Sequence, residues 1–220
     1  MDSPVPPRFT FGLDIGGSGG GEKNDYTARA IIESVGADYF APASVAIPAH
    51  LHLIDLGQPP LGTPYTKVAS DMRKLFTTGT YAGKSELVVD ATGVGRAVVD
   101  MFVYPGAGEE SLQPSRVTIT GGDKVAHEGR EWHVPKRDLV GALLVAFQNR
   151  VLRVADGVRH RQEFIDQLMN FKYKISERGH DTYDAKDGYH DDLVIAVALA
   201  VWRAQHRPVA EVGTMRLGAR

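Results

Sequence analysis

Residues 9–17 read FTFGLDIGG, an apolar run that a single carboxylate, Asp14, interrupts. A glycine-rich turn follows, and residues 25–32, DYTARAII, form a second β-prone run. This pattern predicts a hairpin with Asp14 on its first strand. A charged group on a buried strand is costly unless it is paired or binds a metal, so we interpret Asp14 as either a metal ligand or half of an ion pair.

Composition indicates one soluble globular domain. The 220 residues are 43% hydrophobic and 24% charged, and no apolar tract is long enough to span a bilayer. The chain has no cysteine, which excludes disulfides and thiolate metal sites, and its first residues lack the features of a signal peptide, so we expect an intracellular protein. The formal net charge of −2 means that a nucleic-acid partner would have to be held by a local basic patch.

Three parts are expected along the chain. Residues 1–8 contain three prolines and predict an extended lead-in or linker. Residues 9–205 form the folded domain. Residues 206–220 lack periodicity and predict a C-terminal tail.

Hydrophobic periodicity predicts an α/β domain in which the hairpin comes first and helices alternate with strands afterwards. Further strands are expected at residues 51–56, 85–90, 116–120 and 171–175. Helices are expected at residues 65–76, 96–102, 137–149, 161–170 and 189–202. The polar, glycine-containing segment 176–189 is typical of a solvated loop.

A second carboxylate ends a strand that is expected to be buried on both faces. Residues 85–90, SELVVD, are a short continuous apolar run that stops at Asp90, and residues 91–95, ATGVG, form a tight turn into a helix. Asp90 is therefore expected at the carboxyl end of a central strand, where open α/β sheets place their chemistry.

Two further acids, Asp191 and Asp192, open the almost wholly apolar last helix. Acids in a first helical turn commonly cap N–H groups and complement the helix dipole. Two adjacent aspartates after a histidine are more than a cap requires. His190 itself is a candidate metal ligand, general base or supporting residue, with a helix-start histidine of no catalytic part as the alternative.

These acids come from distant points of the chain and meet only if the last helix docks beside both strands. Their mutual repulsion would then need compensating cations. That arrangement describes a two-metal site, in which two divalent ions stabilise the attacking and leaving oxygens of a phosphoryl displacement. Oxygen-only ligands favour Mg²⁺ or Mn²⁺ over zinc.

The order of these features resembles the ribonuclease H-like nuclease fold, with a mixed central sheet and an antiparallel N-terminal hairpin flanked by helices. Within that fold the chain resembles the nuclease domain of the large terminase subunit of tailed bacteriophages. The matching strings are GLD at 12–14, KNDYTA at 23–28, VVDATGVG at 88–95, TGG at 120–122, VPK at 134–136 with Leu139 and Val140, and HDDLV at 190–194 with Ala196 and Ala198.

The resemblance implies an endonuclease that cuts concatemeric double-stranded phage DNA during packaging, in the cytoplasm of the infected bacterial host. Implied partners are an ATPase motor domain, the small terminase subunit and the portal protein, and no membrane. The implied ligands of two divalent cations are Asp14, Asp90, Asp191 and Asp192. The related Holliday-junction resolvases suggest Asp192 as the main ligand of the adjacent pair.

The resemblance suggests three more residues as DNA contacts or supporting residues near the site. Asp25 is either an active-site residue or an Asx-turn residue that holds the hairpin loop. Lys136 and Lys186 are candidate phosphate contacts, because similar nucleases hold phosphates with basic residues. For Lys136 the alternative is a solvated surface lysine.

One departure from the family and two rival functions follow from the sequence. A complete large terminase carries an ATPase motor, and no G-x-x-x-x-G-K-[ST] string is present here, so we expect an excised or separate nuclease that does not translocate DNA by itself. Residues 13–19, LDIGGSG, also resemble the phosphate-binding hairpin of actin-like and sugar kinases, which predicts ATP binding. A non-catalytic DNA-docking module with residual acids is the third reading.

Overall fold

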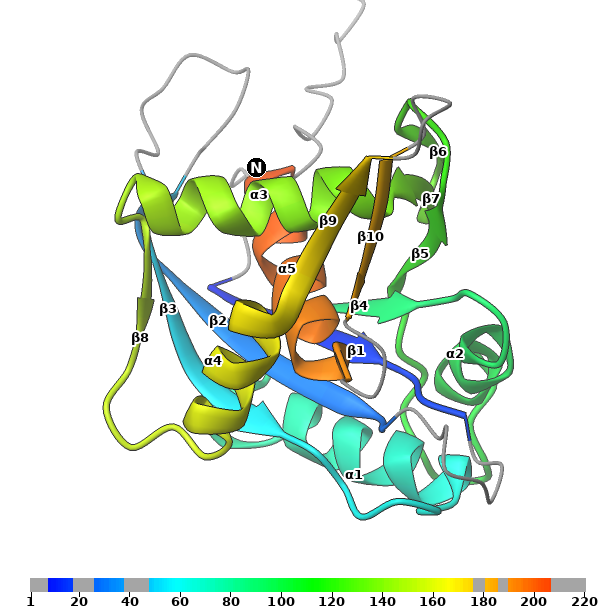
Figure 1. Ribbon diagram of the computed structural model, residues 1–220. Helices are drawn as coiled ribbons and strands as arrows, with labels where there is room; N and C mark the ends of the chain where they lie inside the picture. Colours follow the sequence, from blue (N-terminus) through cyan, green and yellow to red (C-terminus); the bar gives the residue numbers. More distant parts are fainter. Residues whose placement is uncertain (1–7, 18–25, 38–47, 176–180, 186–189, 207–220) are drawn as a thin grey trace, which may run out of the picture.

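An eight-stranded mixed sheet forms the centre of the protein (Figure 1). The computed structural model describes residues 8–17, 26–37, 48–175, 181–185 and 190–206. The strand order is β6-β7-β5-β4-β1-β2-β3-β8. The strands are β1 (Phe9–Asp14), β2 (Ala28–Ala37), β3 (Pro48–Gly57), β4 (Ser85–Asp90), β5 (Ser115–Thr120), β6 (Ala126–Glu128), β7 (Glu131–Pro135) and β8 (Leu152–Val154).

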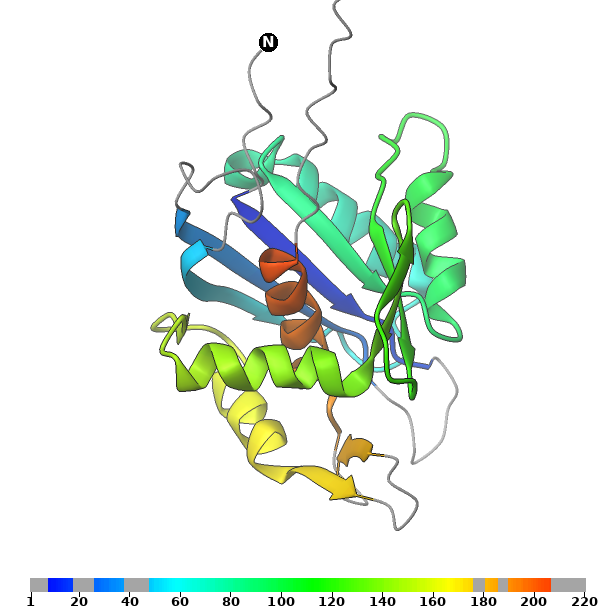
Figure 2. The same ribbon diagram turned by 90° about the horizontal axis from the view of Figure 1, so that it is seen from above.

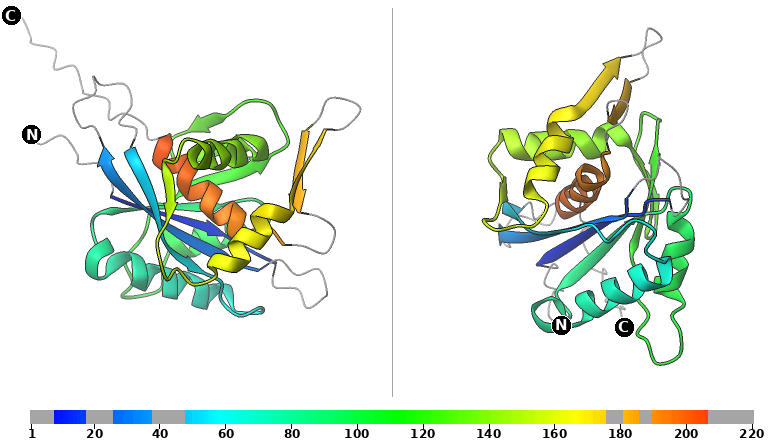
Figure 3. Two further views of the ribbon diagram at one scale, coloured as in Figure 1. Left: turned by 60° about the vertical axis from the view of Figure 1, so that its left-hand side comes forward. Right: turned by 60° about the horizontal axis from the view of Figure 1, so that its bottom comes forward.

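Helices cover both faces of this sheet (Figures 2 and 3). One face carries α1 (Tyr65–Thr77) and α2 (Gly95–Val103). The other carries α3 (Lys136–Gln148), α4 (Arg161–Asn170) and α5 (Asp192–Gln205). A short 3₁₀ turn, η1 (Gly79–Tyr81), follows α1, and a separate hairpin, β9 (Phe171–Ile175) with β10 (Asp181–Ala185), stands beside α3.

The alternation of side chains along β1 decides which helix layer each residue meets. Phe9, Phe11 and Leu13 are buried in the core formed with α1 and α2. Because successive side chains on a strand point to opposite faces, Gly12 and Asp14 face the layer that contains α5. The glycine and the aspartate therefore share one face.

Helix α5 crosses β1 in direct contact at Gly12. A Cβ atom added there would lie 2.1 Å from the carbonyl oxygen of Ala196 and 2.9 Å from the backbone nitrogen of Ala200. From Asp192 to Ala204 every residue of α5 is buried, which agrees with its apolar sequence on all sides. Only a residue without a side chain lets this helix lie so close to the sheet.

A buried ion pair fixes the far end of α5. Arg203 Nε lies 2.5 Å from Glu86 Oε1 on β4, and the two side chains are 7% and 11% exposed. Ser115 Oγ donates to the same Glu86 oxygen at 3.0 Å. The guanidinium also lies over the Trp132 ring, 5.3 Å from its centroid. This network ties α5 to three neighbouring strands, β4, β5 and β7.

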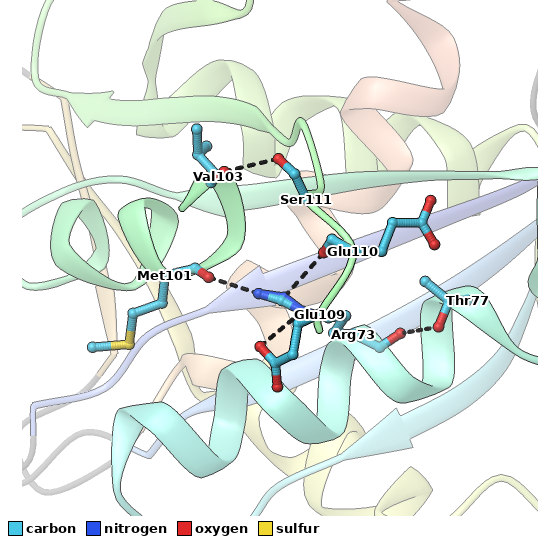
Figure 4. Close-up of polar contacts among 7 residues, drawn as sticks. All are labelled: Arg73, Thr77, Met101, Val103, Glu109, Glu110 and Ser111. Atoms are coloured by element: carbon cyan, nitrogen blue, oxygen red, sulfur yellow. Dashed lines mark hydrogen bonds and ion pairs between the residues drawn. The ribbon is translucent and has the colours of Figure 1, made fainter. Parts of the chain in front are cut away.

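On the opposite face, Arg73 of α1 joins that helix to the segment after α2 (Figure 4). Its guanidinium donates to the carbonyl oxygens of Met101 at 2.6 Å and Glu110 at 3.4 Å, and pairs with Glu109 at 3.4 Å. Arg73 is 5% exposed. The segment that connects α2 to β5 is thus anchored by a buried cation.

The predicted fold class is confirmed, and the elements differ from the prediction in a few places. The last helix begins at Asp192, so His190 and Asp191, which were expected inside it, precede it. Short strands β6, β7 and β8 were missed, and β10 lies in the segment 176–189 that was expected to be a loop. None of the helices in the described residues combines the length and apolar character that a membrane crossing requires.

Candidate active site

Asp14 and Asp90 end two adjacent parallel strands. β1 pairs with β4 in a register that sets Leu13 opposite Val89, so the next residue on each strand is an aspartate. Neighbouring strands lie about 4.8 Å apart. Val88 packs in the core that contains α5, and Asp90, two residues later, shares its face. Both carboxylates therefore stand at one edge of the sheet, on the α5 side.

Asp192 approaches the same edge from above the sheet. Ala196 meets β1 at Gly12, and Asp192 lies one helical turn before Ala196, on the same face of α5. Gly12 and Asp14 likewise share one face of β1. Asp192 is 2% exposed although it is an acid, so its carboxylate is enclosed between the helix and the sheet.

Burial and neighbouring charges both act on the carboxyl group of Asp14. Burial raises the pKa of Asp14 well above its ordinary value. Three neighbouring carboxylates raise this pKa further, in decreasing order Asp90, Asp192 and Asp191. The ammonium of Lys136 lowers it. The charge of Asp14 is thus unfavourable unless more positive charge reaches the cluster.

Asp90 is 9% exposed, and burial raises its pKa. Hydrogen bonding by Thr92 acts against that rise, and the Thr92 backbone N–H donates to Asp90 Oδ1 at 2.8 Å. Lys136 lowers the pKa as well. The carboxylate is therefore held in place by the first residues of the turn that follows it.

Asp191 occupies the position before α5 and pairs with a lysine. Lys136 Nζ, at the start of α3, lies 2.8 Å from Asp191 Oδ2. The side chains are 26% and 21% exposed, so both reach partial solvent. The same ammonium lies 5.7 Å from the centroid of the Phe171 ring. Lys136 is thus part of the acidic cluster, and its reading as a solvated surface lysine was wrong.

His190 lies at the outer side of the cluster. Its Nδ1 is 3.8 Å from Asp192 Oδ2, and its side chain is 37% exposed. The imidazole meets the Tyr26 ring edge to face, with centroids 5.3 Å apart. These contacts place His190 where it could support the position of the Asp192 carboxylate. The remaining predicted residues, Asp25 and Lys186, lie outside the described residues.

The chemistry of this donor set fits a hard divalent cation. Three buried or half-buried carboxylates, Asp14, Asp90 and Asp192, supply oxygen atoms only, and their crowding favours an added positive charge. In the described part of the chain, no three His, Asp or Glu side chains already converge as a finished metal-binding group. Coordination would therefore require side-chain adjustment among these acids.

Two groups at this end of the sheet were not singled out by sequence reasoning. The backbone N–H of Thr92 donates to the Asp90 side chain, which lies two residues earlier. An aspartate at the start of a turn is a recognisable sequence signal for such an Asx turn. Tyr26 contacts His190, and nothing in the local sequence pattern indicates that pairing because the two residues meet only in the fold.

Solved structures share this architecture. The large terminase nuclease from thermophilic phage G20c matches with a TM-score of 0.56 at 18% identity, over 91% of this chain and 83% of that one. The Thermus phage P74-26 large terminase nuclease domain matches with a TM-score of 0.53 at 16% identity, over 92% and 82%. The human cytomegalovirus terminase nuclease domain gives 0.52 at 14% identity, over 89% and 84%.

The G20c nuclease has also been solved with bound magnesium, and that structure matches with a TM-score of 0.54 at 20% identity, over 91% of this chain and 83% of that one. No protein-family model and no curated protein sequence matches the chain. The structural likeness extends over about nine-tenths of the chain. The chain therefore has the ribonuclease H-like fold of the large terminase nuclease domains.

Proposed function

We propose that this chain is a metal-dependent endonuclease that hydrolyses phosphodiester bonds in double-stranded DNA. The observation that carries the proposal is the placement of Asp14, Asp90 and Asp192, from β1, β4 and α5, toward one edge of the sheet. Acids at the carboxyl ends of parallel strands stand where α/β folds place their sites. The shared fold with terminase nucleases, one of them with bound magnesium, supports the same conclusion.

Asp14, Asp90 and Asp192 would hold two divalent cations, Mg²⁺ or Mn²⁺. Such ions, when bound, activate the attacking water and neutralise the leaving oxygen. The three carboxylates would supply oxygen ligands from two strands and a helix, so the adjustment needed for binding falls on their side chains. Asp191, paired with Lys136, would lie beside the metal ligands, and His190 would support Asp192.

The biological setting is part of the proposal. The likeness to terminase nucleases supports cleavage of viral DNA during genome packaging inside the infected bacterial cell. The chain would then act beside an ATPase motor, a small terminase subunit and a portal protein. DNA would be held through its phosphates, so binding should weaken as salt rises.

Digestion of supercoiled plasmid tests the activity. We expect nicking and linearisation with Mn²⁺ or Mg²⁺, none with EDTA, and none from Asp14→Asn, Asp90→Asn or Asp192→Asn. Asp71→Asn is the matched control, because Asp71 is an exposed acid on α1 that pairs with Lys67. Single-stranded DNA and RNA of equal length, run in parallel, test the preference for double-stranded DNA.

Three results would contradict the proposal. Cleavage that survives in the folded Asp90→Asn protein would place the chemistry elsewhere. Absence of cleavage with either cation, together with ATP-dependent thermal stabilisation, would favour the kinase-like function. Absence of DNA cleavage and of ATP-dependent stabilisation would favour a DNA-docking module.

A further inference from the structure

Thr92 joins the end of β4 to β5 through its own hydrogen bonds. Its backbone N–H donates to Asp90 Oδ1 at 2.8 Å. The Thr92 Oγ1 accepts the backbone N–H of Ile119 on β5 at 2.9 Å. The hydroxyl therefore ties to β5 the same residue whose backbone N–H holds the carboxylate of Asp90.

Backbone hydrogen bonds and close packing hold the turn around Thr92 in position. The Ala91 N–H donates to the Val117 carbonyl at 2.7 Å, and the Gly95 N–H donates to the Thr92 carbonyl at 3.1 Å. A Cβ atom on Gly95 would lie 1.9 Å from the Asp90 carbonyl oxygen, so the first turn of α2 presses directly on the end of β4. Thr92 therefore has a fixed position relative to Asp90, although it is itself exposed.

We propose that Thr92 is a positioning residue that orients the Asp90 carboxylate for cation binding. The inference rests on the function proposed above. The backbone N–H of Thr92 holds one oxygen of the carboxylate, and the Thr92 hydroxyl holds that residue against β5. Without the hydroxyl, Thr92 loses its bond to β5, so its backbone N–H and the carboxylate that this N–H holds gain freedom to move.

Isothermal titration of Mg²⁺ and Mn²⁺ into the purified chain tests this role with a readout other than cleavage. Thr92→Val keeps the shape and removes the hydroxyl, and we expect it to weaken cation binding by about tenfold or more, as loss of a partner that orients a metal ligand does. Thr92→Ser restores the hydroxyl and should restore binding. Thr118→Val is the control, because Thr118 lies on β5 on the face opposite Val117 and the acids.

Amide hydrogen exchange supplies a second measurement that does not need the cation. In Thr92→Val the Ile119 amide should exchange faster than in the wild type, while Thr92→Ser should retain its protection. Equal cation affinity in Thr92→Val and the wild type would overturn the inference, as would a Thr92→Ser variant as weak as Thr92→Val.

The outcomes separate this inference from the proposed function. If the wild-type chain binds cations and cleaves DNA but Thr92→Val is unaffected, only the role of Thr92 fails. If the wild-type chain binds neither Mg²⁺ nor Mn²⁺, the proposed function fails and the role of Thr92 fails with it.

Discussion

Lys136 Nζ lies 2.8 Å from Asp191 Oδ2, so one of the two adjacent aspartates at the start of α5 already has a cation supplied by the protein. Its neighbour Asp192 points into the buried space above the sheet and is 2% exposed. The two acids are consecutive in sequence but differ in environment, because Asp191 precedes the helix and Asp192 is its first residue.

This difference predicts unequal effects of neutralising the two acids. Asp192→Asn should abolish cleavage, whereas Asp191→Asn should lower the rate by about 10- to 100-fold, as expected for a residue that acts beside the metal ligands. Plasmid nicking rates at saturating Mn²⁺ measure both variants. A folded Asp191→Asn protein as inactive as Asp192→Asn would show that both acids carry the main load.

The raised pKa of Asp14 predicts how stability depends on pH without metal. Because the folded-state pKa lies above the ordinary value of 3.8, the folded protein binds a proton more readily than the unfolded chain. Stability contributed by this group is therefore present at low pH and is lost as pH rises through the folded-state pKa. The pKa of Asp90 shifts in the same direction.

Replacing Asp14 by asparagine removes a buried negative charge. In EDTA at neutral pH, Asp14→Asn should raise the melting temperature by a few degrees, and the gain should shrink as the pH approaches 4. Added Mg²⁺ should stabilise the wild type more than Asp14→Asn. Thermal melts across this pH range, with and without Mg²⁺, measure both effects, and a variant less stable than the wild type at neutral pH contradicts the prediction.

Gly12→Ala should damage both the fold and the site. The added methyl would overlap the backbone of α5 at Ala196 and push the helix off β1, which we expect to cost about 1–3 kcal/mol or more. Gly141→Ala is the control, since a Cβ there meets nothing within 4 Å and should stabilise α3 by about 0.5–1 kcal/mol. Urea unfolding gives both values. An unchanged free energy of unfolding in Gly12→Ala would mean that α5 does not lie so close.

Arg203→Met should destabilise the protein by about 3–5 kcal/mol, because Glu86 would be left as a buried, unpaired charge. The double variant Arg203→Met with Glu86→Met should lose less free energy of unfolding than Arg203→Met alone. Urea unfolding of the single and double variants measures this coupling. Additive losses would show that the pair does not interact in solution.

The sequence predicted the elements with strong periodicity and missed those without it. The strand ending at Asp90 and the helix at residues 161–170 have the predicted bounds. β6 and β8 have three residues each, too few for alternation to be visible. β10 is polar, and its partner β9 fixes it through backbone pairing that composition does not reveal.

The candidate site was predictable where residues sit at the ends of elements and not where they meet across the fold. Asp14 and Asp90 were recognisable as acids on or after apolar strands. That Lys136 pairs with Asp191, and that Arg203 reaches Glu86, follows from how α5 crosses the sheet, which no local pattern contains. The small residue at Gly12 is the sequence feature that permits the crossing.

The close crossing of α5 over β1 has a consequence for the order of synthesis. Asp14 emerges early and Asp192 late, and the sheet face over Gly12 stays uncovered until α5 arrives. Domains form from the N-terminal end during translation, and contacts between such distant segments form slowly. A chain interrupted before residue 192 would present an open apolar face and an incomplete set of acids. The potential to cut DNA would thus arise only after nearly all of the described chain has been made.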